Sequence, residues 1–294
     1  MTYRPLRRWL GVTLVATVIL GLAISWRVGS AMTEGHPSDV PPAKSPAQDL
    51  IIETDDHLSI AATFVPGRTD NSPAVLLLHA RGGSRASTAK NASWLSGLGY
   101  ATLTIDFRGH GQSTPRPRSF GLNESLDAQA AFQWLKRRQH DAPVAVIGSS
   151  LGGAASLIGK PGPLPAQALV LQAVYPDIRH AIWNRIASRL TAIPSYFLEP
   201  LLSFQIPLRF GVWPARLSPL AALHQYQGPV LVIGGKQDEY TPPSETQMMF
   251  NAVKGPHELW LVPDGDHAAI CDLADPAYRA HIEAFLTKTI GSPG

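Results

Sequence analysis

Short, nearly continuous apolar segments constrain the fold of this chain more than any other feature. There are six, at residues 74–80, 100–106, 143–149, 168–174, 229–235 and 258–263. Helical patterns are expected at 87–97, 123–139, 151–158, 243–253 and 274–289. Strands buried on both faces read as unbroken apolar runs, and alternation with helices indicates crossover connections. The pattern therefore predicts an α/β fold with a mostly parallel central sheet and helices on both faces, preceded by a hairpin at 49–65.

The N-terminus carries an uncharged segment at residues 9–26, preceded by Arg4, Arg7 and Arg8 and followed by Arg27. Eighteen residues is close to the length of a membrane-spanning helix and longer than the apolar part of most signal peptides. The excess of arginine before the segment keeps the N-terminus in the cytoplasm. We expect a membrane anchor or signal segment at residues 1–28, with the rest of the chain outside the cytoplasm.

Other interpretations of this segment stay open. The small residues at 29–31 fit a cleavage site, in which case the protein is exported after signal cleavage. The Arg7-Arg8 pair resembles part of a twin-arginine signal, and a buried helix is a further possibility. Residues 29–48 are rich in Pro, Ala and Ser without periodicity, which predicts a flexible linker before a domain at 49–294.

Charge and cysteine content exclude several classes of function. Without the four arginines that flank the apolar segment, 25 basic residues become 21, against 22 acidic residues. No basic stripe remains, so we expect no nucleic-acid partner. Cys271 is the single cysteine, which rules out an intramolecular disulfide, and no H-E-x-x-H motif or cysteine cluster indicates a metal. The sequence predicts neither a metal nor another cofactor.

The segment Gly148-Ser149-Ser150-Leu151-Gly152 fits the pattern G-x-S-x-G and lies between an expected strand and an expected helix. In that setting the glycines allow a strained turn that leaves the Ser150 hydroxyl exposed above the sheet. The following helix N-terminus favours developing negative charge. Ser150 is therefore the candidate nucleophile, whereas the residues around Ser149 do not match the pattern.

Five segments extend this motif: "LLLHARGGS", "IDFRGHGQS", "IGSSLGGAA", "LVIGGKQDEYTPP" and "VPDGDHA". In this order, over residues from about 50 to 290, the chain resembles the α/β-hydrolase family, and most of all bacterial serine hydrolases and esterases of the dienelactone-hydrolase-like type. The resemblance implies the fold of that family and a catalytic order of nucleophile, acid and histidine. These are Ser150, Asp238 and His267.

The positions of the acid and the base also suit their roles. Asp238 follows an apolar strand by three residues, at the carboxyl edge where sites of open α/β sheets lie. His267 lies in a polar turn between a strand and the last helix. Asp177 also follows a strand and is the alternative acid. The alternative histidines, His257, His281 and His79, occupy less suitable settings, and His79 is expected to anchor a loop.

An acyl-transfer site also needs two backbone N–H groups that bind the oxyanion. We assign them to Leu151, directly after the nucleophile, and to Arg81, in the loop after residues 74–80. Ala80 stands where the family often has glycine. The Arg81 side chain either faces solvent or meets an acidic substrate. Asp106 and Arg108, in "DFRGHGQS", are expected to pin a loop at the rim of the site.

The alternation of strands and helices breaks at about residues 175–227, where the family carries a helical cap. A plain helical pair covering the sheet edge is the alternative. The segment is aromatic, and Trp183, Phe197 and Trp213 are the tentative substrate-binding residues. It holds five arginines against one Asp and one Glu, which predicts neutral or weakly anionic esters with short to medium acyl or aryl groups.

Taken together, these features predict a serine hydrolase of the carboxylesterase type that forms an acyl-enzyme. Its partners would be a small ester substrate and, through the N-terminal segment, a membrane. A serine peptidase acting on small peptides uses the same catalytic set and is the alternative enzyme. A catalytically silent binding protein on the same fold is the alternative from another class.

Overall fold

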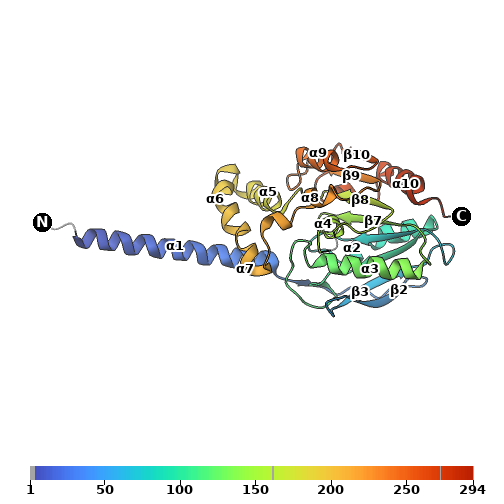
Figure 1. Ribbon diagram of the computed structural model, residues 1–294, viewed down its shortest axis with the longest axis horizontal. Helices are drawn as coiled ribbons and strands as arrows, with labels where there is room; N and C mark the ends of the chain where they lie inside the picture. The colour runs from blue at the N-terminus through green and yellow to red at the C-terminus, as the bar shows by residue number, and fades with distance from the viewer. Residues whose placement is uncertain (1–3, 161, 272, 294) are drawn as a thin grey trace.

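An eight-stranded sheet forms the centre of the domain (Figure 1). The computed structural model describes residues 4–160, 162–271 and 273–293. The strands of the sheet are β2 (Gln48–Glu53), β3 (Ser59–Val65), β4 (Ala74–Leu78), β5 (Ala101–Ile105), β7 (Val144–Ser149), β8 (Ala168–Gln172), β9 (Val230–Gly235) and β10 (His257–Val262). Their order is β10-β9-β8-β7-β4-β5-β3-β2. Only β3 runs antiparallel to its neighbours, so the predicted mostly parallel sheet with an N-terminal hairpin is confirmed.

Helices cover both faces of the sheet. One face packs against α2 (Arg85–Gly97) and α10 (Pro276–Ile290). The other packs against α3 (Glu124–Arg138), α4 (Leu151–Leu157), α8 (Pro219–Leu223) and α9 (Pro243–Ala252). A short 3₁₀ helix, η2 (Ala269–Cys271), lies between β10 and α10.

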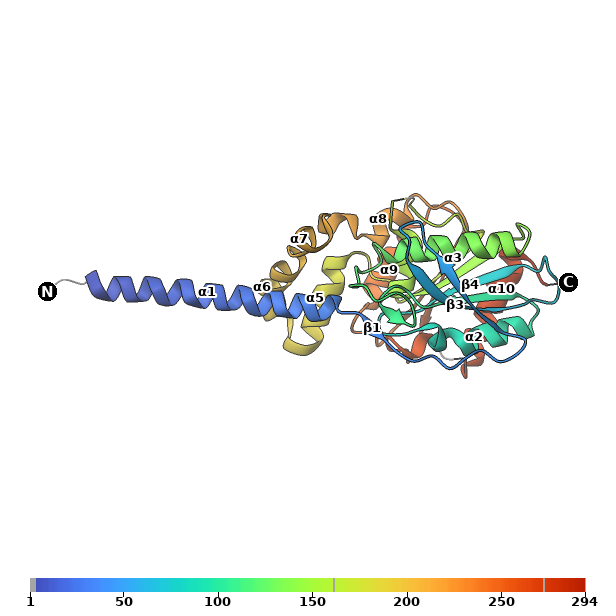
Figure 2. The same cartoon turned by 90° about the horizontal axis from the view of Figure 1, so that it is seen from below.

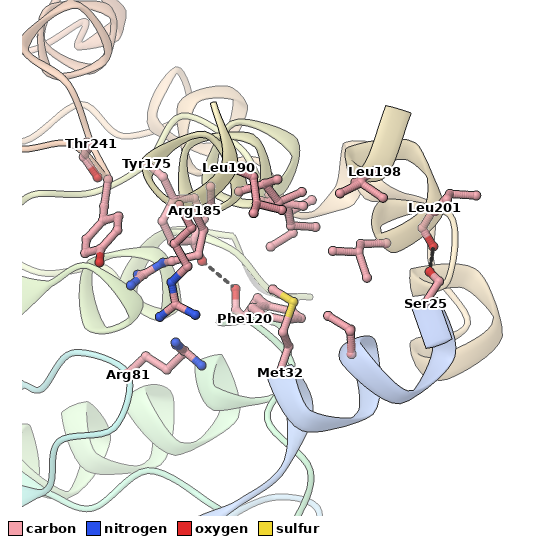
Figure 3. A pocket seen from close by; sticks show the side chains of 18 of the residues that line it. Ser25, Met32, Arg81, Phe120, Tyr175, Arg185, Leu190, Leu198, Leu201 and Thr241 are labelled. Atoms are coloured by element: carbon pink, nitrogen blue, oxygen red, sulfur yellow. Dashed lines mark hydrogen bonds between the residues drawn. The ribbon is translucent and has the colours of Figure 1, made fainter. Parts of the chain in front are cut away.

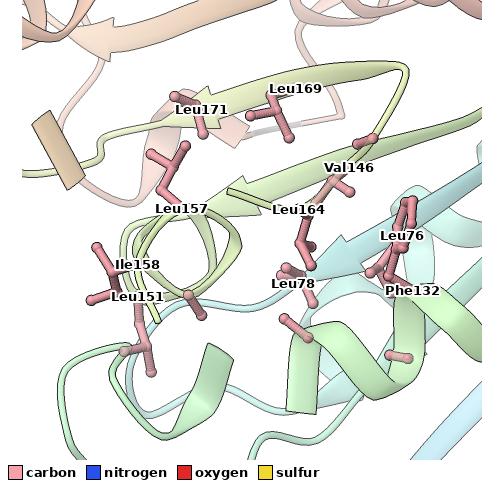
Figure 4. Packing of buried hydrophobic residues seen from close by; sticks show 14 of the residues in the cluster. Leu76, Leu78, Phe132, Val146, Leu151, Leu157, Ile158, Leu164, Leu169 and Leu171 are labelled. Carbon is pink, nitrogen blue, oxygen red and sulfur yellow. The ribbon is translucent and has the colours of Figure 1, made fainter. Parts of the chain in front are cut away.

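The two cores follow from the alternation of side chains along each strand. In β4, Leu76 and Leu78 point into one core, and Val75 and Leu77 point into the other. β7, β8 and β9 divide their side chains in the same way, and Figure 4 shows part of one of the two cores. Each buried aliphatic side chain contributes roughly 1.5–3 kcal/mol relative to an exposed one. This burial on both faces is why the strands read as continuous apolar runs.

The loop after β5 is fixed by buried ion pairs, as its sequence predicts. Arg108 donates to both carboxylate oxygens of Asp127 on α3 and to Asp56. Asp106 accepts the backbone N–H of Arg85 and of Gln112 and also pairs with the Arg85 guanidinium. These contacts tie the loop to the beginning of α2, close to the turn that follows β4.

The cap consists of α5 (Ile178–Leu190), α6 (Ala192–Ser203), α7 (Ile206–Phe210) and the 3₁₀ helix η1 (Pro214–Arg216), which lead into α8. The N-terminal helix α1 (Arg4–Thr33) extends away from the sheet and runs beside α6 (Figures 1 and 2). Its residues Trp9–Thr33 are long and apolar enough to cross a membrane.

The expected flexible linker at residues 29–48 has a different structure. α1 continues to Thr33, and the chain then forms β1 (His36–Pro37), which pairs in parallel with β6 (His110–Gly111). Val40 is buried farther along. A composition rich in proline disfavours helix and central strand, but an extended segment can still bind along the domain surface. The segment therefore connects α1 to the domain through defined contacts.

Candidate active site

The turn between β7 and α4 presents Ser150 at the carboxyl edge of the sheet. Ser150 has φ 47° and ψ −104°, a conformation that costs a non-glycine residue about 1–3 kcal/mol. Its backbone N–H donates to the Gln172 carbonyl at 2.8 Å, and its own carbonyl accepts from Ala154 at 3.0 Å. The strain is thus balanced by hydrogen bonds on both sides, and the hydroxyl lines a cavity instead of packing into the core.

The glycines of the motif allow three backbone segments to meet. A Cβ on Gly148 would lie 2.6 Å from the Gly153 nitrogen, and a Cβ on Gly152 would lie 2.3 Å from the Leu78 carbonyl oxygen. Real Cβ atoms essentially never come this close to backbone atoms. Glycine at these positions is therefore required for the close approach of β7, α4 and β4.

His267 lies in the turn after β10, and its partner is Asp238 in the turn after β9. The His267 Nδ1–H donates to Asp238 Oδ2 at 2.8 Å. The other oxygen, Oδ1, accepts the backbone N–H groups of Tyr240 and Thr241, each at 2.8 Å. Asp238 is buried, so these donors hold the carboxylate in place. The rings of Tyr240 and His267 are nearly perpendicular, with centroids 5.4 Å apart.

A polar network behind the nucleophile positions the His267 turn. Gln172, at the end of β8, accepts from the Ser149 hydroxyl at 2.6 Å and from the Cys271 thiol at 3.2 Å, and donates to the Tyr278 hydroxyl at 2.7 Å. Burial raises the pKa of Cys271 to about 11, so it stays a neutral thiol donor at neutral pH. This network was not predicted from the sequence, where its only signal is a glutamine within an apolar run.

The backbone positions assigned to the oxyanion site lie beside the nucleophile. Leu151 is the first residue of α4, and Arg81 follows β4; both line the same cavity as Ser150 and His267. The Arg81 loop is held by His79, whose Nδ1–H donates to the Ala80 carbonyl at 2.8 Å and whose Nε2 accepts from the Phe107 N–H at 3.1 Å. Burial lowers the pKa of His79 to about 3, so the ring is neutral and keeps this pattern.

The alternative residues have other contacts. Asp177 is the N-cap of α5, where it accepts the N–H groups of Arg179 and His180 and pairs with the His180 ring. The His257 ring contacts the Gly255 carbonyl, and the His281 ring stacks on Trp260. None of these three candidates is paired with His267 or Ser150 in the contacts of the described residues. Among those residues there is also no group of three His, Cys, Asp or Glu side chains placed to bind a metal ion.

The cavity at Ser150 has a volume of about 600 Å³ and is lined mainly by aliphatic side chains from α1, α5 and α6. The tentative substrate-binding residues are not among its lining. Trp183 and Trp213 line a second cavity, on the other side of the cap, and the Phe197 ring is 68% exposed. On α5 the residues that reach the Ser150 cavity include Ile178, Ile182 and Ile186, which follow the helical repeat and leave Trp183 on a different side.

Comparison with known proteins agrees with this geometry. Residues 73–217 match the sequence profile of the alpha/beta hydrolase fold. An uncharacterized protein of Mycobacterium tuberculosis is 30% identical over 85% of this chain and 84% of its own length. The lysophosphatidylserine lipase ABHD12 of Rattus norvegicus is 31% identical over 55% of this chain, and the match spans only 43% of that protein. A Pyrococcus furiosus esterase has the same fold, with a TM-score of 0.68, 21% identity and coverage of 88% of this chain and 99% of that one.

The packing of the nucleophile turn can be tested by Gly152→Ala. The added methyl group meets the Leu78 backbone, which cannot rotate away, so we expect a loss of about 2 kcal/mol in the free energy of unfolding. Gly97→Ala is the matched control: a Cβ there meets nothing within 4 Å, and alanine restricts the unfolded chain. Urea unfolding of the two variants measures both values, and equal stabilities would contradict the close approach at Gly152.

Proposed function

Because the chain belongs to the α/β-hydrolase fold family, we propose that it is a serine hydrolase that cleaves carboxylic esters through an acyl-enzyme intermediate. One observation carries the proposal: Ser150 and His267 line the same cavity, and Asp238 holds the distal nitrogen of His267 at 2.8 Å. A serine hydroxyl is a poor nucleophile until a neighbouring base takes its proton, and this arrangement supplies the base and its orienting group.

In the first half-reaction the Ser150 Oγ attacks the ester carbonyl, and His267 Nε2 takes the hydroxyl proton. Asp238 keeps the other ring nitrogen protonated and stabilises the imidazolium. The negative charge on the former carbonyl oxygen is bound by the backbone N–H groups of Leu151 and Arg81. His267 then gives its proton to the alkoxide oxygen, the alcohol leaves, and the acyl group stays on Ser150.

In the second half-reaction a water molecule attacks the acyl-enzyme while His267 takes its proton. The tetrahedral intermediate collapses, the acid is released and the proton returns to Ser150. The overall reaction consumes one ester and one water and gives one acid and one alcohol.

The ester class is supported by two comparisons, since one relative is named a lysophosphatidylserine lipase and one solved structure of the same fold is named an esterase. The largely aliphatic lining of the cavity also favours an acyl chain over a peptide. A silent binding protein on this fold would leave an activated ester intact. A serine peptidase would also hydrolyse an activated ester, so faster cleavage of aminoacyl amides than of esters would mark that alternative.

Replacing the nucleophile separates an enzyme from a binding protein. Ser150→Ala should lower hydrolysis of an activated ester such as para-nitrophenyl acetate by several powers of ten, because the residues of a triad act as a unit. Ser149→Ala is the matched control, since the Ser149 hydroxyl points to Gln172, and it should retain most of the activity. Equal losses in the two variants would show that Ser150 is not the nucleophile.

Asp238→Asn tests the acid of the triad. An amide beside Nδ1 favours the wrong tautomer of His267, so we expect kcat to fall by about 10⁴. Asp177→Asn changes the alternative acid, and because Asp177 caps α5 its replacement should affect mainly the stability of the cap, with a small change in kcat. If the Asp177 variant lost more activity than the Asp238 variant, the acid would lie after β8 instead.

The localisation that we propose is a membrane anchor formed by the N-terminal helix, with the domain outside the cytoplasm. The contacts of α1 with the cap support an uncleaved anchor. The Ser25 hydroxyl donates to the Leu201 carbonyl, and Arg209 on α7 donates to the Trp26 carbonyl while lying over the Trp26 ring. Cleavage at the small residues 29–31 would remove these partners from the folded protein.

The topology can be measured with a reporter fused after Gly294. It should be active only outside the cytoplasm, because more arginines precede the apolar segment than follow it. Carbonate washing should leave the full-length protein in the membrane fraction. Release by carbonate, together with a mature N-terminus near Ala31 or Met32, would show a cleaved signal peptide.

A further inference from the structure

A helix with the length of a membrane span forms one wall of the cavity that contains Ser150. The lining residues of α1 are Gly21, Ile24, Ser25, Val28 and Met32, which follow the i, i+3, i+4, i+7 spacing of one helix face. Opposite them lie aliphatic side chains of α5 and α6, among them Leu190, Leu198 and Leu201 (Figure 3). The cavity thus runs from the catalytic serine to the surface of the membrane helix.

Polar contacts hold α1 in this position. Gln205, at the start of α7, donates to the carbonyl and hydroxyl oxygens of Ser25 at 3.0 and 2.8 Å. Arg209 donates to Ser30 as well as to Trp26. A Cβ on Gly29 would lie 2.2 Å from the Gln205 amide oxygen, so the helix approaches α7 closely at this glycine. α1 is therefore docked on the cap by side-chain contacts on several consecutive turns.

Most of the exposed large apolar side chains outside α1 lie on the cap, which contacts this helix. Outside α1, the described residues include eleven large apolar side chains that are exposed, and all but Ile51 and Met248 lie between residues 190 and 213. Ile193, Phe197, Leu208 and Trp213 are between 65% and 77% exposed. Large apolar patches on a soluble surface are unfavourable, and those next to a membrane helix are suited to the bilayer interface.

The length of the apolar segment indicates where the cavity would lie relative to a bilayer. Residues 9–26 extend about 27 Å as a helix, close to the roughly 30 Å hydrocarbon core of a bilayer. α1 therefore leaves the hydrocarbon near the turns that face the cap. The apolar end of the cavity lies next to the acyl region of the membrane.

The catalytic end of the cavity is basic. Arg81, Arg185 and Arg189 line it, while no Asp or Glu is among its lining residues. None of the three arginines takes part in an ion pair between described residues, although the Arg185 guanidinium lies 3.6 Å from the centre of the Tyr240 ring. Figure 3 shows Arg81 and Arg185 directed toward one another. Burial, together with the positive charges of Arg118, Arg185 and Arg189, lowers the pKa of Arg81, so a bound anion would relieve repulsion at this point.

We propose that the cavity takes an anionic amphiphilic ester directly from the bilayer, with its acyl chain along the lining residues of α1 and its anionic group on Arg81, Arg185 and Arg189. This inference rests on the proposed ester hydrolysis and specifies its substrate class. The acyl chain passes from lipid into the part of the cavity between α1 and α6, here called the groove, without crossing water. The arginines hold the alcohol side of the ester near Ser150, and they set the orientation in which the carbonyl meets the nucleophile.

The experiment uses the full-length protein in phosphatidylcholine vesicles and two matched probes, the dodecanoyl ester of para-hydroxybenzoate and that of its methyl ester. The probes share the acyl chain and differ by one negative charge at the para position of the leaving group. Ile24→Trp fills the groove, whereas Ile19→Trp is the same substitution about 140° further round the helix and outside the lining. We expect kcat/KM for both dodecanoyl probes to fall at least tenfold in Ile24→Trp and to stay within twofold of the wild-type value in Ile19→Trp.

The anionic subsite is tested by the ratio of kcat/KM for the anionic probe to that for its methyl ester. Arg185→Gln should lower this ratio about tenfold, because a charge-assisted hydrogen bond is lost. Arg216→Gln replaces an exposed arginine of the cap outside the cavity and should leave the ratio unchanged. Thermal unfolding checks that the Ile24→Trp variant is folded. Val28→Trp fills the same part of the cavity one helical turn farther along and provides a second test.

Two outcomes would overturn the inference: equal activity of Ile24→Trp and Ile19→Trp on the dodecanoyl probes, or a ratio that Arg185→Gln does not change. The proposed function is separated from it by para-nitrophenyl acetate, which is too short to reach α1. Ser150-dependent hydrolysis of the acetate, together with no effect of the groove or arginine variants on the dodecanoyl probes, would refute only the inference about the substrate class. Hydrolysis of the acetate by Ser150→Ala would refute the proposed function itself.

Discussion

The close backbone packing of β4, β7 and α4 is the constraint on which the rest of the site depends. Gly152 lies against the Leu78 carbonyl and Gly148 against Gly153, at distances that leave no room for a side chain. This packing holds Ser150 at a positive φ and directs its hydroxyl away from the core. It also places the N-terminus of α4 beneath the hydroxyl, where a helix favours negative charge. The backbone strain at Ser150 is thus offset by the stability of the large buried sheet around it.

Buried polar groups with satisfied hydrogen bonds position the remaining parts of the site. His79 links the Arg81 loop to Phe107. Gln172 links Ser149, at the end of β7, to Cys271 in η2. Each group exchanges hydrogen bonds with partners far away in sequence, which is favourable only when every donor and acceptor is matched. The loops around the cavity are therefore held by specific contacts as well as by apolar packing.

Much of this arrangement could be predicted from the sequence, for definite physical reasons. The parallel strands could be recognised because both of their faces are buried. The turn at Ser150 could be recognised because few sequences permit the backbones of β4, β7 and α4 to approach so closely. The Gln172 network could not be predicted, since one polar residue in a strand does not reveal its partners. The inner side of α6 was equally hidden. In the segment "AIPSYFLEPLLS" the polar residues Ser195, Glu199 and Ser203 form one stripe, and the structure buries this stripe, so the usual rule that the polar side of a helix is exposed gives the wrong orientation. Trp183, Phe197 and Trp213 were assigned to substrate from composition alone, and the structure places them on other surfaces of the cap.

The contacts of α1 with the cap could not be predicted from the sequence either. An apolar span has the same pattern whether the helix only anchors the domain or also lines its cavity. We propose that the contacts of α1 bring the membrane, the cap and Ser150 together at one cavity. The most direct test is an experimental structure of the full-length protein after reaction with a fluorophosphonate that carries a dodecyl chain. We expect phosphorus on Ser150 Oγ and the alkyl chain between Ile24 and Val28 of α1 and Ile186 of α5. Phosphorus on another residue, or an alkyl chain directed away from α1, would contradict the claim.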